Sequence, residues 1–352
     1  MKLAPNLLTL IHRFTEPFKQ IVLECQSARY AAGFFPRLRI PLVERKNDSA
    51  NSSTIICLRK RQRGALEIEA DTAWLRSRNG FSTAWRRLGV FVSLVSQPEI
   101  PSGEWVADLG DWVHAEGPLL GFCTNFRQTL LVPDRGFLLS GGYATQRRQA
   151  LAAPVFEDRQ DIISWRGSPT GSGKLFTLGM DPRDPLLRQR IRMCLLLRDI
   201  AAGGCPEVDV RLAAGSHLPI IATAHYESAG IIGPTIAQSV WCQCKFAIDI
   251  DGHANAFSNL FVRLLFGCCV IKIASPLGFR QWYYDFLQPW QHYIPVAADL
   301  SDLVDKLEWC QRHSADCRTV AAQGQALAFS LTIDSEFRRA LQTIRSRHQD
   351  DC

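Results

Sequence analysis

An apolar strand pattern, a glycine turn, a polar loop and an apolar helix pattern follow one another in the second half of the chain, and this order constrains the fold more than any other feature. Residues 245–250 have the length and composition of a buried strand, which ends at Asp251-Gly252, where glycine tolerates a positive φ. Apolar side chains recur at helical spacing over residues 257–265, and residues 268–273 have the pattern of the next buried strand. We therefore expect an α/β fold in which a ligand binds outside the carboxyl ends of parallel strands.

Two blocks of the sequence carry a resemblance to a known family. The first is IDIDG at residues 248–252, with Asn255-Ala256 and the helix pattern after it; the second and more specific block is QPWQHYIPV at 288–296, followed by DLSDL at 299–303. Weaker matches are WRGS at 165–168 and the arginines that open a later helix pattern. Over about residues 105–330 the chain resembles glycosyltransferase family 90, which contains capsule-associated (CAP10-like) proteins, animal protein O-glucosyltransferases and bacterial lipopolysaccharide-modifying transferases.

The resemblance implies a GT-B-like fold, which consists of two Rossmann-type domains with parallel sheets and a facing cleft. It also implies an inverting, metal-independent transfer of a hexosyl or pentosyl group from a nucleotide sugar, interpreted as UDP-linked, to a saccharide or glycolipid acceptor, without a further cofactor. The turn and loop residues expected to contact this donor are Asp251, Gly252, His253, Asn255, Ala256 and Ser258. Ser258 stands where the animal members carry an arginine, so the loop is more similar to that of the bacterial members, and we expect a role in lipopolysaccharide or other surface-glycan modification.

The chain is long enough for two domains, and we place their boundary near residues 152–161. The predicted domains are an N-terminal α/β domain, 1–155, with the acceptor side and the catalytic base, and a C-terminal nucleotide-sugar-binding domain, 156–352, with terminal helices. Apolar runs predict strands at 88–95, 105–109, 119–123, 128–132, 161–165 and 208–212. Helices are predicted at 1–26, at 186–200, after a cap at Ser301, and in two further segments up to Arg347; the polar residues 44–54 are expected to form an exposed loop.

A glycine-rich loop at residues 167–175 has a superficial similarity to a phosphate-binding P-loop. That motif requires glycine where this chain has Ser168, and a hydroxyl residue where it has Leu175, so an NTPase is a minor alternative. The family resemblance implies that the loop faces the donor and that arginines neutralise the diphosphate, since a guanidinium stabilises the leaving group without a metal. The residues expected in these roles are Arg166, Gly167, Ser168, Thr170, Arg190 and Arg192. For the last two, a solvated helix face is the alternative.

Asp249 and Asp251 match the DxD pattern with which other glycosyltransferases hold a divalent ion. Asp249 lies among apolar neighbours in a predicted strand and Asp251 opens a turn, and the resembled family keeps this motif without depending on a metal. We therefore expect no metal site. His292, in the second family block, lacks partners at metal-ligand spacing, and that block is expected to form a rigid wall beside the donor.

Inverting transfer requires a base that takes the proton of the acceptor hydroxyl group, and carboxylates are the usual choice. Asp111 is the candidate, because the segment 107–112 weakly resembles the one that holds the catalytic aspartate of the family. Asp108 could take this role instead, or both aspartates could cap a turn.

The formal charge of +6 favours anionic ligands but is too small for a nucleic-acid-binding surface. Basic residues gather at 59–63, 76–87 and 147–148, either as a solvated face or as a peripheral contact with an anionic membrane or glycolipid. The twelve cysteines lack CxxC spacing, and no apolar run reaches membrane-spanning length, which indicates reduced thiols in a cytoplasmic protein, with the inner membrane as a peripheral location. A non-catalytic nucleotide- or carbohydrate-binding protein on the same fold is the main alternative to an enzyme.

Overall fold

The computed structural model describes residues 40–44, 53–77, 83–202, 207–214, 220–255 and 257–350. The predicted helix at 1–26 and most of the predicted loop at 44–54 lie outside this part of the chain. Two compact units are formed: unit 1 contains residues 1–122, 126–135 and 337–352, and unit 2 contains 123–125 and 136–336. The α/β class and the two sheet-bearing units expected of a GT-B-like fold are confirmed.

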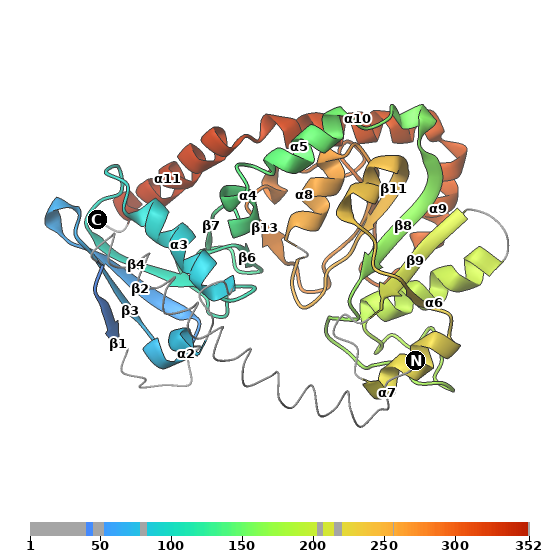
Figure 1. The fold of residues 1–352 in the computed structure, drawn as a ribbon, viewed down its shortest axis with the longest axis horizontal. Helices are drawn as coiled ribbons and strands as arrows, with labels where there is room; N and C mark the ends of the chain where they lie inside the picture. Colours follow the sequence, from blue (N-terminus) through green and yellow to red (C-terminus); the bar gives the residue numbers. More distant parts are fainter. Residues whose placement is uncertain are drawn as a thin grey trace, which may run out of the picture. The chain divides into compact units, whose positions relative to one another are not determined.

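Unit 2 is built on a six-stranded sheet in which every recorded strand pair is parallel (Figure 1). Its strands, in spatial order, are β10 (Ile232–Gly233), β9 (Glu207–Ala213), β8 (Gln160–Gly167), β11 (Cys244–Asp249), β12 (Cys269–Ile273) and β14 (Ile294–Val296). The central strands are almost continuously buried, which explains why they could be recognised as apolar runs. The predicted strands at 161–165, 208–212, 245–250 and 268–273 are thus confirmed within one or two residues.

The chain leaves the centre of this sheet in opposite directions. From β8 it passes through α6 (Gln189–Ala202) to β9, whereas from β11 it passes through α8 (Ser258–Leu265) to β12 on the other side. The strand order therefore reverses between β8 and β11, the position at which open α/β sheets bind ligands.

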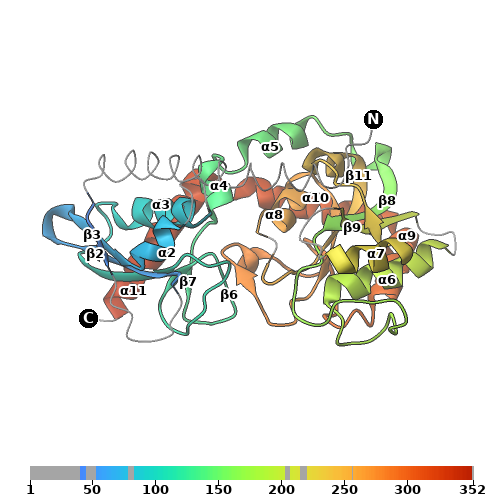
Figure 2. The same ribbon diagram turned by 60° about the horizontal axis from the view of Figure 1, so that its bottom comes forward.

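Helices cover both faces of the unit 2 sheet. α6 contacts β9, and α10 packs on α8 and β12 (Figure 2). The other helices are α4 (Arg135–Leu139), α5 (Ala144–Leu151), α7 (Ile220–Ser228), α9 (Leu303–Arg312), α10 (Ser314–Ser330) and α11 (Ile333–Asp350), the last of which continues into unit 1. The cap predicted at Ser301 is wrong, because Asp302 occupies the N-cap position of α9 without a side-chain cap hydrogen bond.

The segment 136–155 belongs to unit 2, although the sequence placed it in the N-terminal domain. The buried ring of Phe137 in α4 lies 5.5 Å, centroid to centroid, from the ring of Phe261 in α8. Arg147 in α5 donates hydrogen bonds to the carbonyls of Phe329 and Leu331 at the end of α10. These contacts are distant in sequence, so composition gives no sign of them. β6 (Cys123–Thr124) likewise pairs with β13 (Arg280–Gln281).

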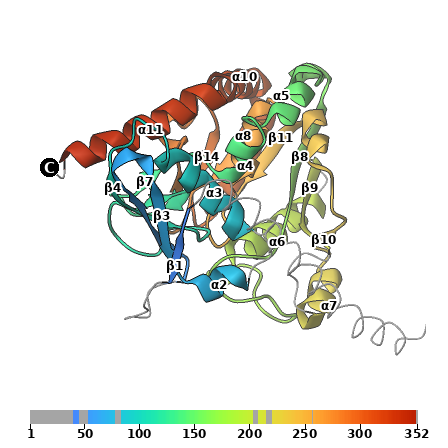
Figure 3. The same cartoon turned by 60° about the vertical axis from the view of Figure 1, so that its left-hand side comes forward.

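Unit 1 contains a second six-stranded sheet (Figure 3). The expectation of a parallel sheet is wrong for this unit, because β2 runs antiparallel to both of its neighbours and the sheet is therefore mixed. Its strands are β1 (Leu42–Glu44), β3 (Leu66–Ala70), β2 (Ile55–Lys60), β4 (Gly103–Asp108), β5 (Leu120–Gly121) and β7 (Leu130–Leu131), and its further helices are α2 (Thr72–Arg76) and α3 (Thr83–Val95). The strand predicted at 88–95 is wrong, because these residues complete α3. Nearly the whole helix is buried, and a helix buried all round has the same continuous apolar pattern as a buried strand. None of the described helices is long and apolar enough to cross a membrane.

Candidate functional site

A pocket of about 170 Å³ lies at the carboxyl ends of the unit 2 strands. Its walls come from loops that follow β8 (170–172), β11 (251–253), β12 (276–279) and β14 (Ala298), and from the start of α6. The pocket therefore includes the point at which the strand order reverses, as the predicted fold required. Of the expected donor residues, the ones that line it are Thr170, Arg192, Asp251, Gly252 and His253.

Two glycines let the loops after β8 and β11 approach each other. A Cβ atom on Gly252 would lie 2.5 Å from Oγ1 of Thr170 and 3.1 Å from Cζ of Arg190, so any side chain there would displace the neighbouring loop. Gly171 has a φ of +129°, and a Cβ on it would lie 3.4 Å from the carbonyl oxygen of Gly252. Glycine at both positions is therefore what allows these two pocket loops to lie against each other.

Arg190 is buried beneath the pocket and holds its loops together, rather than lying on an accessible helix face as predicted. Its guanidinium donates to the carbonyls of Ile250, Asp251 and Ser168, at 2.9, 2.8 and 3.2 Å, and to Oγ1 of Thr170 at 3.0 Å. Burial lowers the pKa of Arg190 to about 10, against the opposing effect of nearby aspartates, and the group remains a cation at neutral pH. Arg190 thus supports the site from within.

Arg166 is not available to a diphosphate in this structure, which contradicts the role expected for it. It forms a bidentate pair with the carboxylate of Asp209 on β9, at 2.6 and 2.8 Å. Its remaining donors bond to the carbonyls of Trp165, Asp209 and Pro234, so every N–H group of the guanidinium has a protein acceptor. Arg166 therefore fixes β8 against β9 and against the residue that follows β10.

Arg192 is the arginine that lines the pocket. It donates to the carbonyl of Asp299 at 2.9 Å, while its buried Nε has no hydrogen-bond partner among the described residues. Gln189, one turn earlier on the same helix, donates to the carbonyl of Ala298 at 2.7 Å. The start of α6 therefore brings one cation and one amide to the pocket.

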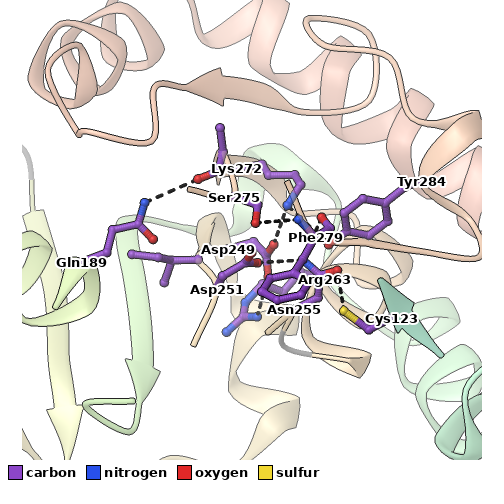
Figure 4. Close-up of polar contacts among 12 residues, drawn as sticks. Cys123, Gln189, Asp249, Asp251, Asn255, Arg263, Lys272, Ser275, Phe279 and Tyr284 are labelled. Atoms are coloured by element: carbon purple, nitrogen blue, oxygen red, sulfur yellow. Dashed lines mark hydrogen bonds and ion pairs between the residues drawn. The ribbon is translucent and has the colours of Figure 1, made fainter. Parts of the chain in front are cut away.

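A buried network of charged side chains lies beside the pocket, at the carboxyl ends of β11 and β12 (Figure 4). Nζ of Lys272 lies 3.2 Å from Oδ2 of Asp249, and Nη1 of Arg263 lies 4.0 Å from Oδ1 of the same carboxylate. Burial by itself would lower the pKa of Lys272, but the charges of Asp249 and Asp251 outweigh this effect and raise it. Lys272 is therefore held as a cation, and Asp249 is occupied by protein cations.

Asp251 and Asn255 form a second part of this network. Nδ2 of Asn255 donates to Oδ1 of Asp251 at 2.8 Å, and its Oδ1 accepts from the thiol of Cys123 at 3.3 Å (Figure 4). Burial raises the pKa of Asp251, although Lys272 and hydrogen bonds from Ser275 and Asn255 oppose this shift. Asn255 is thus buried as a support of the turn and does not line the pocket, whereas Asp251 does.

The two aspartates of the DxD pattern do not present a pair of carboxylates to one ligand. Asp249 is bonded to cations inside the unit, and Asp251 is bonded to Asn255 at the pocket wall. Within the described ranges, no group of three or more histidine, cysteine or acidic side chains could hold a metal ion.

The other expected donor residues have different positions. Gly167 packs against the ring of Trp165, Ser168 offers its carbonyl to Arg190, and Ser258 is the first residue of α8. Ala256 lies outside the described residues. His292 is buried, and its Nδ1 accepts from the amide of Gln288. The residues after the glycine-rich loop at 167–175 run to α6 without a helix of their own, so the minor NTPase alternative lacks its structural context.

Sequence reasoning missed the wall contributed by 276–279 and Ala298 and the network around Lys272. The former could have been found, because residues 276–279 follow the strand predicted at 268–273, and loops at the same edge of a parallel sheet lie near one another. The network could not, since a lone lysine in an apolar strand does not reveal its partner.

The candidate base segment lies in unit 1, at the end of β4. Asp111 is 58% exposed, and its Oδ1 lies 2.6 Å from Nη2 of Arg87. Asp108 is buried, with Oδ1 accepting from the amide of Gly110 at 2.7 Å and Oδ2 accepting from the amide of His114 at 3.0 Å. Asp108 thus caps a turn, as one interpretation expected, and its oxygens are not accessible to an acceptor.

Residues 225–335, which include β11, α8, β12 and β14, match the family model described as "Glycosyl transferase family 90". The resemblance identified from the sequence blocks is confirmed by this match and by the relatives that follow. Protein O-glucosyltransferase 2 of Danio rerio is 36% identical over 256 residues, which are 67% of this chain and 45% of that protein. Protein O-glucosyltransferase 3 of Homo sapiens is 31% identical over 87 residues, which are 25% of this chain and 17% of that protein.

The chain spans less than half the length of either of these relatives. Among solved structures, the crystal structure of Anabaena HepE in complex with UDP-glucose aligns with a TM-score of 0.34 and 12% identity, over 58% of this chain and 53% of that chain. A likeness this weak carries no weight for the fold or for a ligand.

Proposed function

We propose that this chain, whose residues 225–335 carry the glycosyltransferase family 90 region, is an enzyme that transfers a sugar from a nucleotide sugar to a hydroxyl group of an acceptor. The observation that supports this proposal most is the pocket at the point of strand reversal, because the family 90 match includes its walls at 251–253, 276–279 and Ala298. It combines one partly buried guanidinium with close-packed glycine backbone, a set that suits an anionic, hydroxyl-rich ligand.

In the proposed donor complex, Arg192 and the amides of the 170–172 loop bind the diphosphate, whereas the amide of Gly252 donates to the carbonyl of Ala254. Arg190 contributes its charge from below without contacting the ligand, because its donors are directed at protein carbonyls. Positive charge placed near the diphosphate before reaction stabilises the negative charge that develops as the sugar leaves. At about 170 Å³ the pocket is smaller than the roughly 300 Å³ of an ordinary ligand site, so it holds part of such a donor.

The finer assignments are also proposals. We take the donor to be UDP-linked, the transfer to invert the anomeric carbon without a metal, and the acceptor to be a saccharide or glycolipid of a surface glycan, modified in the cytoplasm. The nine cysteines of the described residues are free and buried, which supports a reducing compartment. Contact with an anionic membrane would depend on basic residues other than Arg59 and Lys60, because Arg59 pairs with Glu69 and Glu104, and Lys60 donates to the carbonyls of Gln97 and Ile100.

Ligand binding tests the donor site directly. Thermal unfolding is measured with UDP, GDP and dTDP and their glucose conjugates, and calorimetry of the best ligand is repeated with EDTA. A bound donor raises the unfolding free energy by about 2.7 kcal/mol at a hundred times its Kd. A tenfold loss of affinity on chelation, about 1.4 kcal/mol, would contradict metal-free binding.

A pair of matched variants separates the pocket from general charge effects. Arg192→Gln is expected to weaken nucleotide binding by about 1.5–3 kcal/mol. Arg312→Gln also removes one positive charge, but from an exposed ion pair with Glu308, and should leave nucleotide binding unchanged. If no nucleotide or nucleotide sugar stabilises the protein, the proposal is wrong. Tight binding without turnover would favour the non-catalytic binding protein.

A further inference from the structure

A second cavity, of about 330 Å³, lies within unit 2. Its walls come from the segment 150–159, which leads from α5 to β8, from Gly267 after the end of α8, and from one side of α10. The residues that line it differ from those of the donor pocket, whose 251–253 loop lies before the start of α8. The cavity is therefore a separate place in the fold, and its volume is sufficient for a small organic ligand.

Arg159, in the wall of this cavity, is a cation that is only 8% exposed. Its Nε donates to the carbonyl of Pro154 at 3.0 Å, and its Nη1 donates to the carbonyls of Phe266 and Gly267 at 2.7 and 2.8 Å. These bonds tie the start of β8 to the end of α8, where the helix dipole favours a positive charge. Within the described residues no carboxylate bonds to Arg159, although buried charges in proteins are normally paired.

Two nitrogen donors converge in this cavity above a glycine. Nη2 of Arg159 has two N–H groups, and neither has an acceptor in the part of the chain that the structure describes. A Cβ atom on Gly267, whose φ is +70°, would lie 3.3 Å from this Nη2 and 2.8 Å from Nε2 of Gln325. Nε2 of Gln325 uses one of its N–H groups for the carbonyl of Leu265, at 2.9 Å, and keeps the other. The absence of a side chain at Gly267 thus leaves both donors open to a ligand.

The remaining lining of the cavity indicates the charge and the character of this ligand. Arg318 on α10 donates to the carboxylate of Glu157 at 2.8 Å, so the charges of these two lining residues offset each other and that of Arg159 is left over. Most of the other lining residues are alanine, proline, valine or phenylalanine. A ligand with one negative charge and an apolar body matches this surface, whereas a phosphate monoester carries nearly two charges at neutral pH.

We propose that this cavity binds a small organic acid, whose carboxylate accepts hydrogen bonds from Arg159 and Gln325 and whose apolar body contacts the alanines of α10. The carboxylate supplies the counter-charge that the buried guanidinium lacks among the described residues, through charge-assisted hydrogen bonds. Binding here does not depend on the proposed sugar transfer, because the cavity and the donor pocket are lined by different residues.

Hexanoate is the first probe, and its binding to the full chain is measured by ligand-observed NMR without nucleotide. Hexanamide has the same apolar chain without the charge, and we expect it to bind about tenfold more weakly or worse, because it forms no charge-assisted bond. Butanoate keeps the charge but buries two methylenes fewer, which should weaken binding about tenfold. Hexyl phosphate should bind no better than hexanoate.

Variants locate the bound probe. Arg159→Met should weaken hexanoate binding about tenfold or more. Because this change also removes the bonds to the end of α8, its fold is checked by circular dichroism, and a second variant leaves Arg159 in place. Ala322→Phe, at an exposed lining position of α10, fills the cavity and should abolish hexanoate binding. Ala315→Phe makes the same change at an exposed position of this helix that does not line the cavity, and should leave binding unchanged.

Equal affinities for hexanoate and hexanamide would overturn the proposal, and so would wild-type affinity for hexanoate in Ala322→Phe. Tighter binding of hexyl phosphate would overturn the choice of a carboxylate. Displacement of hexanoate by UDP would place the probe in the donor pocket and would also contradict the proposal. Nucleotide binding by Ala322→Phe should equal that of the wild type, so the two sites are tested independently of each other.

Discussion

Replacing Arg190 by methionine should destabilise the protein strongly, whereas the same change at Arg192 should not. The first variant keeps an apolar chain of similar length but leaves the buried carbonyls of Ile250 and Asp251 without their donor. Each unsatisfied buried acceptor costs about 1–3 kcal/mol, so the expected loss is about 2–6 kcal/mol. Arg192→Met removes a hydrogen bond to an exposed carbonyl, which is worth about 0.5–1.5 kcal/mol.

The free energy of unfolding is measured by urea titration followed by circular dichroism, and the comparison uses the midpoint at constant m-value. Nucleotide affinity is measured on the same samples. Arg192→Met is expected to lose no more than about 1.5 kcal/mol of unfolding free energy and to lose nucleotide affinity. If the unfolding free energy of Arg190→Met lies within about 1 kcal/mol of the wild-type value, the guanidinium does not hold the pocket loops together, and its hydrogen bonds add no net stability.

Four further changes probe the pocket, its surroundings and the packing of α4 on α8. Asp249→Asn should cost about 3–5 kcal/mol in unfolding free energy, because it leaves the buried Lys272 without its counter-charge. Asp251→Asn should lower the unfolding free energy less. Burial raises the pKa of Asp251, so the stabilising contribution of this carboxyl group is present at low pH and is lost as pH rises through that pKa. Urea titrations at several pH values should therefore show the unfolding free energy of the variant rising relative to that of the wild type as pH increases. Gly252→Val should abolish nucleotide binding in calorimetry, since its Cβ would lie 2.5 Å from Oγ1 of Thr170; retained affinity would place the ligand elsewhere. Phe137→Ala should cost about 3–5 kcal/mol in the same urea assay, and a neutral effect would contradict its burial against α8.

Much of unit 2 could be predicted from the sequence because its strands are buried on both faces and punctuated by glycine turns. The order of strand, turn, helix and strand from 245 to 273 was enough to place a ligand loop after β11. The same apolar density misled the prediction at 88–95, where α3 is buried nearly all round. When an element is buried on all sides, its apolar residues no longer recur at the helical or the strand spacing, so the two cannot be distinguished from the sequence.

The arginines illustrate a second limit, part of which was avoidable. Arg190 and Arg192 stand two residues apart on a helix, which rotates them about 200° from each other, so one common face could not hold both. The sequence could therefore have assigned them different roles, although not which of them points inward. Arg166 offered no such clue, because its partner Asp209 lies on a strand 43 residues away. Pairing across a sheet depends on register, which a single sequence does not record.

The path of the chain between the two units limits how this protein can be divided. The chain passes from one unit to the other after residues 122, 125, 135 and 336, the last time within the continuous helix α11. Neither unit is a contiguous segment, so a single cut, by protease or by gene truncation, cannot release either of them whole. Loss of order in α11 removes residues from both units at once. Heating should therefore melt the molecule in one calorimetric transition, with equal van't Hoff and calorimetric enthalpies.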